Sequence, residues 1–256
     1  MSKFASIVSA SPQTMPELPT ALKKPRGHPE IINIQAIKTE IETSWQNTET
    51  PNEFKEALLE ILRKSLKTGS QVVKEHFLSK NNGADTVVAQ AFLMDSLIQI
   101  TYETIIEKLY RAPNPTQGEQ LCIVAVGGYG RGELAPFSDI DLLFLLPYKL
   151  TPHTEQVVET ILYMLWDMRL RVGHSTRSIQ ECMHQAKADM TIRTAILESR
   201  FIIGEMSLLA QMIKRFQREV VAGTALDFVE AKLKESETRH KKLGDSRYVI
   251  EPNIKD

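Results

Sequence analysis

Cysteine, net charge and long apolar runs are all scarce in this sequence. Its 256 residues include two cysteines, Cys122 and Cys182, which is too few for a disulfide framework or a cysteine-based zinc site. The formal net charge of -1 provides no electrostatic basis for binding nucleic acid or a membrane surface. No apolar run has the length of a signal peptide or a membrane-spanning helix. We therefore expect a cytoplasmic protein with neither nucleic-acid nor membrane partners.

The first part of the chain changes character near residue 50. Residues 1–50 begin with a Ser-, Pro- and Thr-rich stretch of little periodicity, which predicts a disordered or loosely ordered lead. Residues 51–112 carry apolar side chains every three or four positions, as packed helices do. Within them, Gly69 is a candidate helix break or kink, and Asp85 is a candidate N-cap for the following helix.

The spacing of the apolar residues changes in residues 113–256. The apolar runs 121–126 and 141–147 are short and bounded by turn residues, which predicts strands buried on both faces. Segments 171–179 and 200–204 predict further strands, and amphipathic helices lie between them. Strands buried on both faces need helices on both sides. This part therefore predicts an α/β (α+β) fold, with a small sheet flanked by helices.

The stretch AVGGYGRGELAPFSDIDLLFLLP connects the first two predicted strands. Its glycines do not form a P-loop, because no lysine follows them as the pattern G-x-x-x-x-G-K-[ST] requires. They do not form the dinucleotide fingerprint G-x-G-x-x-G either, because Glu133 stands where the last glycine should be. Both motifs also lead into a helix, whereas this stretch leads into a strand. The two best-known phosphate loops are therefore excluded.

The spacing of glycines and aspartates in this stretch predicts a metal site. Side chains two apart on a strand share one face, so Asp139 and Asp141 should project together while Ile140 points to the core. Adjacent carboxylates repel unless a cation lies between them, and Mg²⁺ is commonly held by one or two carboxylates plus substrate phosphates. Gly127 and Gly128 would let phosphate groups approach the backbone. We therefore predict a magnesium–triphosphate site at the sheet edge.

Neighbouring residues extend the predicted site. Arg131, between Gly130 and Gly132, is expected to neutralise phosphate charge, and Ser138 to donate a hydrogen bond. Tyr129 is expected to pack over the turn rather than stack on a base. An Asp-x-Asp alone is a weak signal, and its combination with the double glycine and the two apolar strands makes the prediction specific.

These motifs resemble the polymerase-beta-like nucleotidyltransferase superfamily. In residues 87–256, VGGYGRGELAPFSDIDLLFL, LWDMRLRVGHSTRS, ADMTIRTAILESRFIIG and DSRYVIEPNIKD also resemble the N-terminal part of the bacterial PII uridylyltransferase/uridylyl-removing enzymes. The resemblance implies a mixed sheet of the polymerase-beta-like nucleotidyltransferase type in residues 113–256. It also implies magnesium-dependent transfer of UMP from UTP to a tyrosine of the PII nitrogen-signalling protein. It places in the nucleotide loop Gly127, Gly128, Gly130 and Arg131, and among the catalytic metal ligands Asp139 and Asp141.

The sequence departs from this family in two respects. The superfamily usually has a third acidic residue on a neighbouring strand, but residues 172–177 contain no carboxylate. Asp189, Glu198 and His174 are the open candidates for a third ligand or general base. The family also continues into a uridylyl-removing HD hydrolase domain and ACT domains, which these 256 residues do not show. We expect a fragment of a longer chain, with a natural truncation as the alternative.

Two other functions stay open. One is an adenylyltransferase acting on another protein or on a small molecule, because nothing in the sequence identifies uracil as the base. The other is a regulatory module that binds nucleotide without turnover, which the missing third carboxylate would favour. The paired aspartates oppose that second alternative, because a sensor has less need of two metal-binding carboxylates.

Overall fold

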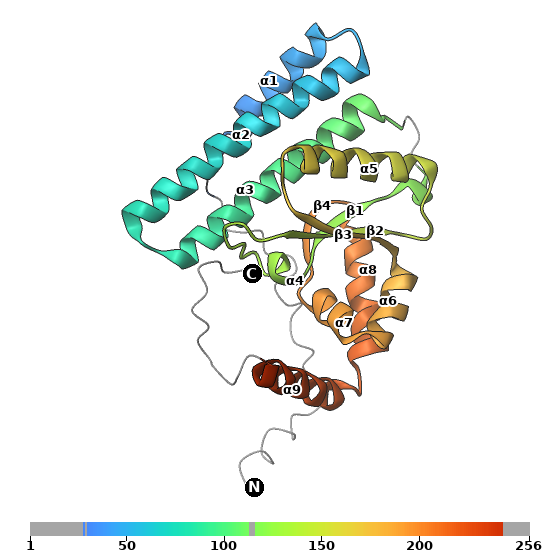
Figure 1. Ribbon diagram of the computed structural model, residues 1–256. Helices are drawn as coiled ribbons and strands as arrows, with labels where there is room; N and C mark the ends of the chain where they lie inside the picture. Colours follow the sequence, from blue (N-terminus) through green and yellow to red (C-terminus); the bar gives the residue numbers. More distant parts are fainter. Residues whose placement is uncertain (1–27, 29, 113–115, 243–256) are drawn as a thin grey trace.

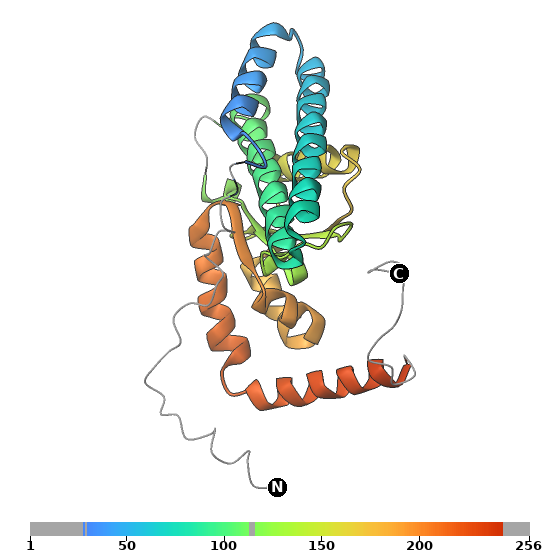
Figure 2. The same cartoon turned by 90° about the vertical axis from the view of Figure 1, so that its left-hand side faces the viewer.

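The computed structural model describes residues 28, 30–112 and 116–242 (Figure 1). The start of the expected lead and the motif after residue 242 lie outside the described residues. The helical part contains three long helices and a π-helical turn: α1 (Ile34–Asn47), α2 (Pro51–Lys80), α3 (Gly83–Thr104) and η1 (Ile105–Leu109). The three helices lie alongside one another in Figures 1 and 2.

Helix α1 lies inside the segment that we expected to be a loosely ordered lead. The side chain of Asn33 caps it by accepting a hydrogen bond from the backbone N–H of Ala36 at 3.0 Å. Ile37 and Ile41, one turn apart, are buried in the core with α2 and α3. The expectation for residues 34–47 was therefore wrong, because two isoleucines are enough to anchor a short amphipathic helix on its neighbours.

The glycine and cap predictions in this part were also wrong. Helix α2 continues without a break through Gly69, where a Cβ would lie 2.5 Å from Leu93 Cδ1. The glycine thus permits close packing of α2 on α3 rather than a kink. The N-cap of α3 is Asn82, whose side chain accepts from the backbone N–H groups of Ala84 and Asp85.

Residues 116–242 contain a four-stranded mixed sheet, whose strands lie in the order β3-β2-β1-β4. Strand β1 (Cys122–Ala125) is antiparallel to β2 (Ile140–Leu146) and to β4 (Arg200–Gly204). Strand β3 (Val172–Ser178) runs parallel to β2 at the sheet edge. The remaining elements are η2 (Gln117–Glu119), α4 (Gly127–Gly130), α5 (Pro152–Asp167), α6 (Ile179–Ala188), α7 (Met190–Leu197), α8 (Met206–Phe216), η3 (Gln217–Val221) and α9 (Ala225–Lys242). The expected α/β architecture, with a mixed sheet flanked by helices after a helical N-terminal part, is confirmed.

The sheet separates two hydrophobic cores, as burial on both faces predicted. Leu142 and Phe144 point into a core shared with α2, α3 and α5, whereas Leu143 and Leu145 point into a core shared with α6 and α8. Figure 1 shows α3 and α5 on one side of the sheet and α6, α7 and α8 on the other. None of the helices in the described ranges combines the length and apolar character needed to cross a bilayer.

Candidate active site

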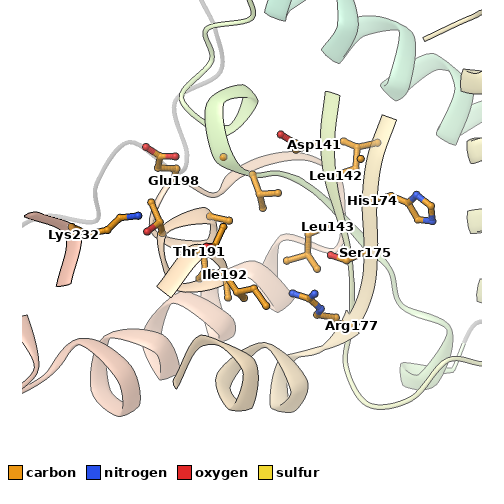
Figure 3. A pocket seen from close by; sticks show the side chains of 16 residues that line it. Asp141, Leu142, Leu143, His174, Ser175, Arg177, Thr191, Ile192, Glu198 and Lys232 are labelled. Carbon is orange, nitrogen blue, oxygen red and sulfur yellow. The ribbon is translucent and has the colours of Figure 1, made fainter. Parts of the chain in front are cut away.

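Asp141 lies at the second position of β2, between the glycine turn and the edge strand. It pairs with Gly173 across the parallel β2–β3 ladder. A Cβ on Gly173 would collide with Asp141 Oδ1, and a Cβ on Gly127 would lie 3.5 Å from Oδ2. The carboxylate is therefore flanked on two sides by residues without side chains, and it lines a cavity on the α6–α7 side of the sheet (Figure 3).

This cavity has a volume of about 480 Å³ and is enclosed by the glycine turn, β2, β3 and α7, with one residue from α9. Among the described residues, its lining includes apolar side chains, hydroxyl groups, two carboxylates, and the cationic side chains of an arginine and a lysine. The polar and charged lining residues are Asp141, His174, Ser175, Arg177, Thr191, Thr194, Glu198 and Lys232. A cavity of this size accommodates a small-molecule ligand, and its mixed lining suits one that carries both charge and a flat apolar part.

Arg177 and Lys232 are cations of this cavity that the sequence analysis did not assign to the site. Arg177 stands four residues after Gly173 on β3, and alternation along the strand puts it on the face that Asp141 occupies. The period-two pattern used for Asp139 and Asp141 could therefore have identified it. Lys232 reaches the cavity from α9, where it also pairs with Glu235 at 2.6 Å. Its place depends on the tertiary fold, which no local pattern reveals.

Helix α9 is held near the cavity by a buried arginine of α7. Arg193 donates a hydrogen bond to Thr224 Oγ1 at 2.6 Å, just before α9 begins. Its guanidinium carbon also lies 4.7 Å from the ring centroid of Phe228 in α9. Because Phe228 and Lys232 are four positions apart on one helix, they share a face. Arg193 thus helps to aim Lys232 at the cavity.

The predicted glycines have different structural roles. Gly127 has a backbone φ of 59°, a left-handed conformation that glycine adopts at little cost, and it lines the cavity. A Cβ on Gly128 would lie 3.6 Å from Arg131 Nη2. Gly130 is buried, and a Cβ there would collide with the backbone carbonyl of Glu198. Gly127 therefore borders the ligand space, whereas Gly130 permits close packing behind it.

Arg131 is half-exposed and forms an ion pair with Glu198, with 2.8 Å between Nη1 and Oε1. This pair lies at the cavity's edge, because Glu198 lines it. Ser138 lies elsewhere: it lines a second cavity, on the opposite side of the sheet. The structure thus brings Gly127, Asp141 and Glu198 to one cavity and places Ser138 outside it.

The two aspartates predicted to bind metal differ in their position relative to the cavity. Asp139 is half-buried directly before β2 and does not line the cavity that Asp141 lines. Among the described residues, no three His, Cys, Asp or Glu side chains are grouped to hold a metal ion. Of the two predicted metal ligands, the structure thus brings Asp141, and not Asp139, to this cavity.

The three candidates for a third ligand or base differ in position. Asp189 is the N-cap of α7 and accepts from the backbone N–H groups of Thr191 and Ile192, which lower the pKa of its carboxyl. The ring of His174 points away from the cavity (Figure 3), with its centroid 5.7 Å from that of Trp166 on α5. Glu198 is half-buried and lines the cavity. Its position favours Glu198 over the other two.

A buried polar network lies behind the glycine turn. The Tyr129 hydroxyl donates to Asp95 Oδ1 at 2.5 Å, and Arg200 donates to Asp95 and to the backbone carbonyl of Tyr129. Burial, and then the Asp95 charge, raise the pKa of Tyr129 well above its usual value. Tyr129 is 1% exposed, so it packs over the turn and is not available to stack on a base.

The sequence is similar to known nucleotidyltransferases. The GlnE family model, described as glutamate-ammonia ligase adenylyltransferase, matches residues 1–170. A bifunctional uridylyltransferase/uridylyl-removing enzyme from Azospirillum brasilense is 51% identical over 226 residues, which cover 88% of this chain and 24% of that enzyme. An enzyme of the same description from Rhodospirillum rubrum is 48% identical over 236 residues, covering 92% of this chain and 25% of the relative. The chain thus spans about a quarter of the length of these curated relatives.

Proposed function

Because the chain belongs to the GlnE-type nucleotidyltransferase family and is homologous to bifunctional uridylyltransferase/uridylyl-removing enzymes, we propose that it transfers UMP from UTP to a tyrosine of the PII nitrogen-regulatory protein. Pyrophosphate is the second product. Residues 113–256 form the nucleotidyltransferase domain, with the polymerase-beta-like arrangement of strands, and residues 51–112 are its helical companion. The two cysteines are free and buried, which fits a reaction in the reducing cytoplasm.

The observation that carries this proposal is the position of Asp141. Its carboxylate opens onto the same cavity as Arg177 and Lys232, and it lies next to Gly127 and Gly173, where a Cβ would crowd its oxygens. Carboxylate oxygens are the ligands that Mg²⁺ prefers, and substrate phosphates commonly complete its coordination. Asp139 and Asp141 would hold the ion. When bound, it would supply positive charge against the triphosphate oxygens.

The other cavity residues divide between binding and proton transfer. Arg177 and Lys232 bind the triphosphate, because charge-assisted hydrogen bonds to phosphate are strong. The acceptor hydroxyl forms a bond to the α-phosphorus while the bond from that phosphorus to pyrophosphate breaks. The hydroxyl proton passes to a base, and we assign this role to Glu198, the carboxylate other than Asp141 among the described residues that line the cavity.

A second candidate is transfer of AMP rather than UMP. The family model that matches residues 1–170 is described as an adenylyltransferase for glutamate-ammonia ligase. Uridylyl transfer is the stronger proposal, because the two relatives cited above are 48–51% identical and both carry the uridylyltransferase description. A non-catalytic nucleotide-binding module is the third possibility, and it differs from the other two by releasing no pyrophosphate.

Intact-protein mass spectrometry tests these functions directly. The chain would be incubated with Mg²⁺ and the PII protein from the same source, with either UTP or ATP. We expect a UMP-sized increment on PII with UTP, which Asp139→Asn and Asp141→Asn abolish or reduce by roughly 10²–10³-fold. Asp227→Asn, an exposed change on α9, serves as the matched control and should leave the rate unchanged. An AMP-sized increment would establish the second candidate. Nucleotide binding without any increment or pyrophosphate would contradict both transfer reactions.

A further inference from the structure

A second cavity, larger than the one that Asp141 lines, is formed by other described residues. It has a volume of about 830 Å³ and lies on the opposite side of the sheet, between α2, α3, the loop 134–138 and the turn 168–171. Its floor consists of buried apolar side chains, among them Val73, Met94, Ile140 and Met168. The proposed nucleotide site uses none of these residues.

The rim of this cavity is strongly basic. Lys67 and Lys74 line it from α2, and Arg169 and Arg171 line it from the turn after α5. All four side chains are exposed, and none forms an ion pair with another described residue. No aspartate or glutamate is among the described residues that line the cavity. Four like charges over an apolar floor create a positive potential that attracts an acidic ligand with apolar groups.

Two aromatic side chains stand at the same rim. Phe137 is 89% exposed and Phe77 is 38% exposed, and both line the cavity. The backbone φ of Phe137 is 67°, in the left-handed region that a bulky residue seldom adopts. This conformation presents the ring to solvent instead of burying it. Exposed aromatic rings beside arginines are the side chains that contribute most to protein–protein interfaces.

The loop that carries Phe137 leads directly to the proposed catalytic aspartates. Ser138 and Ile140 line the large cavity, whereas Asp141 lines the nucleotide cavity on the other side of the strand. Phe137 and Asp139 are two residues apart, so their Cα atoms can be separated by at most about 7 Å. A partner docked over Phe137 would therefore lie close to the start of β2, where the proposed catalytic aspartates are.

We propose that Lys67, Lys74, Phe77, Phe137, Arg169 and Arg171 form a basic–aromatic surface that docks an acidic segment of the protein acceptor. An apolar or aromatic side chain of that segment enters the cavity, while its carboxylates pair with the basic rim. The proposal rests on the proposed function, because it assumes that the acceptor is a protein. It differs from a nucleic-acid surface in having an apolar floor, which a sugar–phosphate backbone cannot occupy.

Binding and turnover test this surface separately. The binding probe is a fluorescein-labelled peptide in which glutamates flank a tyrosine, compared with the same peptide carrying lysines. We expect the glutamate peptide to bind more tightly, and the double variant Lys67→Glu/Lys74→Glu to weaken its binding about tenfold or more. Phe137→Asn, which removes the ring but tolerates the left-handed backbone, should weaken it similarly. Lys149→Glu/Lys214→Glu changes the net charge equally at exposed positions that line neither cavity, and should not weaken binding.

In the turnover assay, the surface variants should raise KM for the acceptor protein and leave KM for UTP unchanged. Equal binding of the two peptides, or equal losses in the surface and control variants, would overturn the proposal. A change from dimer to monomer in the surface variants, seen by sedimentation, would also overturn it by assigning the surface to a second copy of the chain. Selective peptide binding without any transfer would contradict the proposed function and leave the docking surface standing.

Discussion

Arg200 and Asp95 form a buried ion pair that connects β4 to α3 behind the glycine turn. Arg200 Nη1 lies 2.6 Å from Asp95 Oδ2, and the two side chains are 4% and 6% exposed. Arg200 Nη2 also donates to the backbone carbonyl of Tyr129 at 3.3 Å, and the Tyr129 hydroxyl donates to Asp95. The helical part, the glycine turn and the sheet thus meet in one polar network, which fixes where the turn stands relative to Asp141.

Removing one charge of this pair should destabilise the whole protein. Asp95→Asn leaves the Arg200 guanidinium buried without its counter-ion, which typically costs about 3–5 kcal/mol. The measurement is the free energy of unfolding in urea. Glu103→Gln provides the control, because Glu103 lies in the same helix and pairs with Lys38 at 2.7 Å on the surface, where such pairs contribute about 0–1 kcal/mol. If the free energy of unfolding fell by a similar amount in both variants, the buried pair would contribute no more to stability than the surface pair.

A methyl group beside Asp141 should impair catalysis more than it impairs folding. Gly173→Ala introduces a Cβ that collides with Asp141 Oδ1, and that carboxylate can avoid it only by rotating away from its present position. We expect a fall in kcat of roughly 10²-fold or more, because small displacements of a catalytic group are costly. Steady-state kinetics, with the free energy of unfolding measured in parallel, test this.

Gly83→Ala is the matched control for Gly173→Ala. Nothing lies within 4 Å of a Cβ at Gly83, which is the first residue of α3. The substitution should leave kcat unchanged and alter stability little. Wild-type kinetics in Gly173→Ala would mean that Asp141 tolerates displacement and does not need its present geometry.

Loss of a cation from the nucleotide cavity should weaken the binding of UTP. Arg177→Gln removes a charged group from the face of β3 that borders Asp141. A charge-assisted hydrogen bond of about 1.5–3 kcal/mol corresponds to roughly a 10- to 100-fold rise in the dissociation constant for UTP. Uridine, which has no phosphates, should show no such change. Arg218→Gln, at an exposed arginine that pairs with Glu219, is the control. An unchanged affinity for UTP in Arg177→Gln would place the triphosphate elsewhere.

The sequence was most informative where its pattern was local. Short apolar runs bounded by turn residues located the two central strands, and the glycine–aspartate spacing led to Asp141, because each depends on neighbours along the chain. Helix α1 was missed because Ile37 and Ile41 are buried only by contacts with α2 and α3, which are not neighbours in the local sequence pattern.

Contacts between segments that are distant in the chain could not be predicted from local sequence patterns. Arg131 forms an ion pair with Glu198, which is 67 positions away and which no spacing rule indicates as its partner. Lys232 lines the cavity of Asp141 from α9, and the start of that helix is bound by Arg193 of α7.

Both cysteine thiols should make the protein less stable at alkaline pH. Burial raises the pKa of Cys122 and of Cys182 from about 9 to about 12. The unfolded chain loses these protons near pH 9, whereas the folded chain keeps them until about pH 12. Above pH 9 the unfolded state therefore binds fewer protons, and the free energy of unfolding falls as pH rises. The stabilisation is fully present below pH 9 and is lost between about pH 9 and 12.

The double variant Cys122→Ala/Cys182→Ala isolates this contribution. Its free energy of unfolding should fall less steeply than that of the wild type between pH 9 and 10.5, because each thiol contributes a slope approaching about 1.4 kcal/mol per pH unit. The variant is less stable at pH 7, since it leaves small cavities, so the slopes are compared rather than the absolute values. At pH 8, Ellman's reagent should react slowly with the native chain and rapidly with both thiols in urea. Parallel pH slopes together with fast native labelling would mean that the thiols are open to solvent, contrary to their burial in the core between the sheet, α6 and α8.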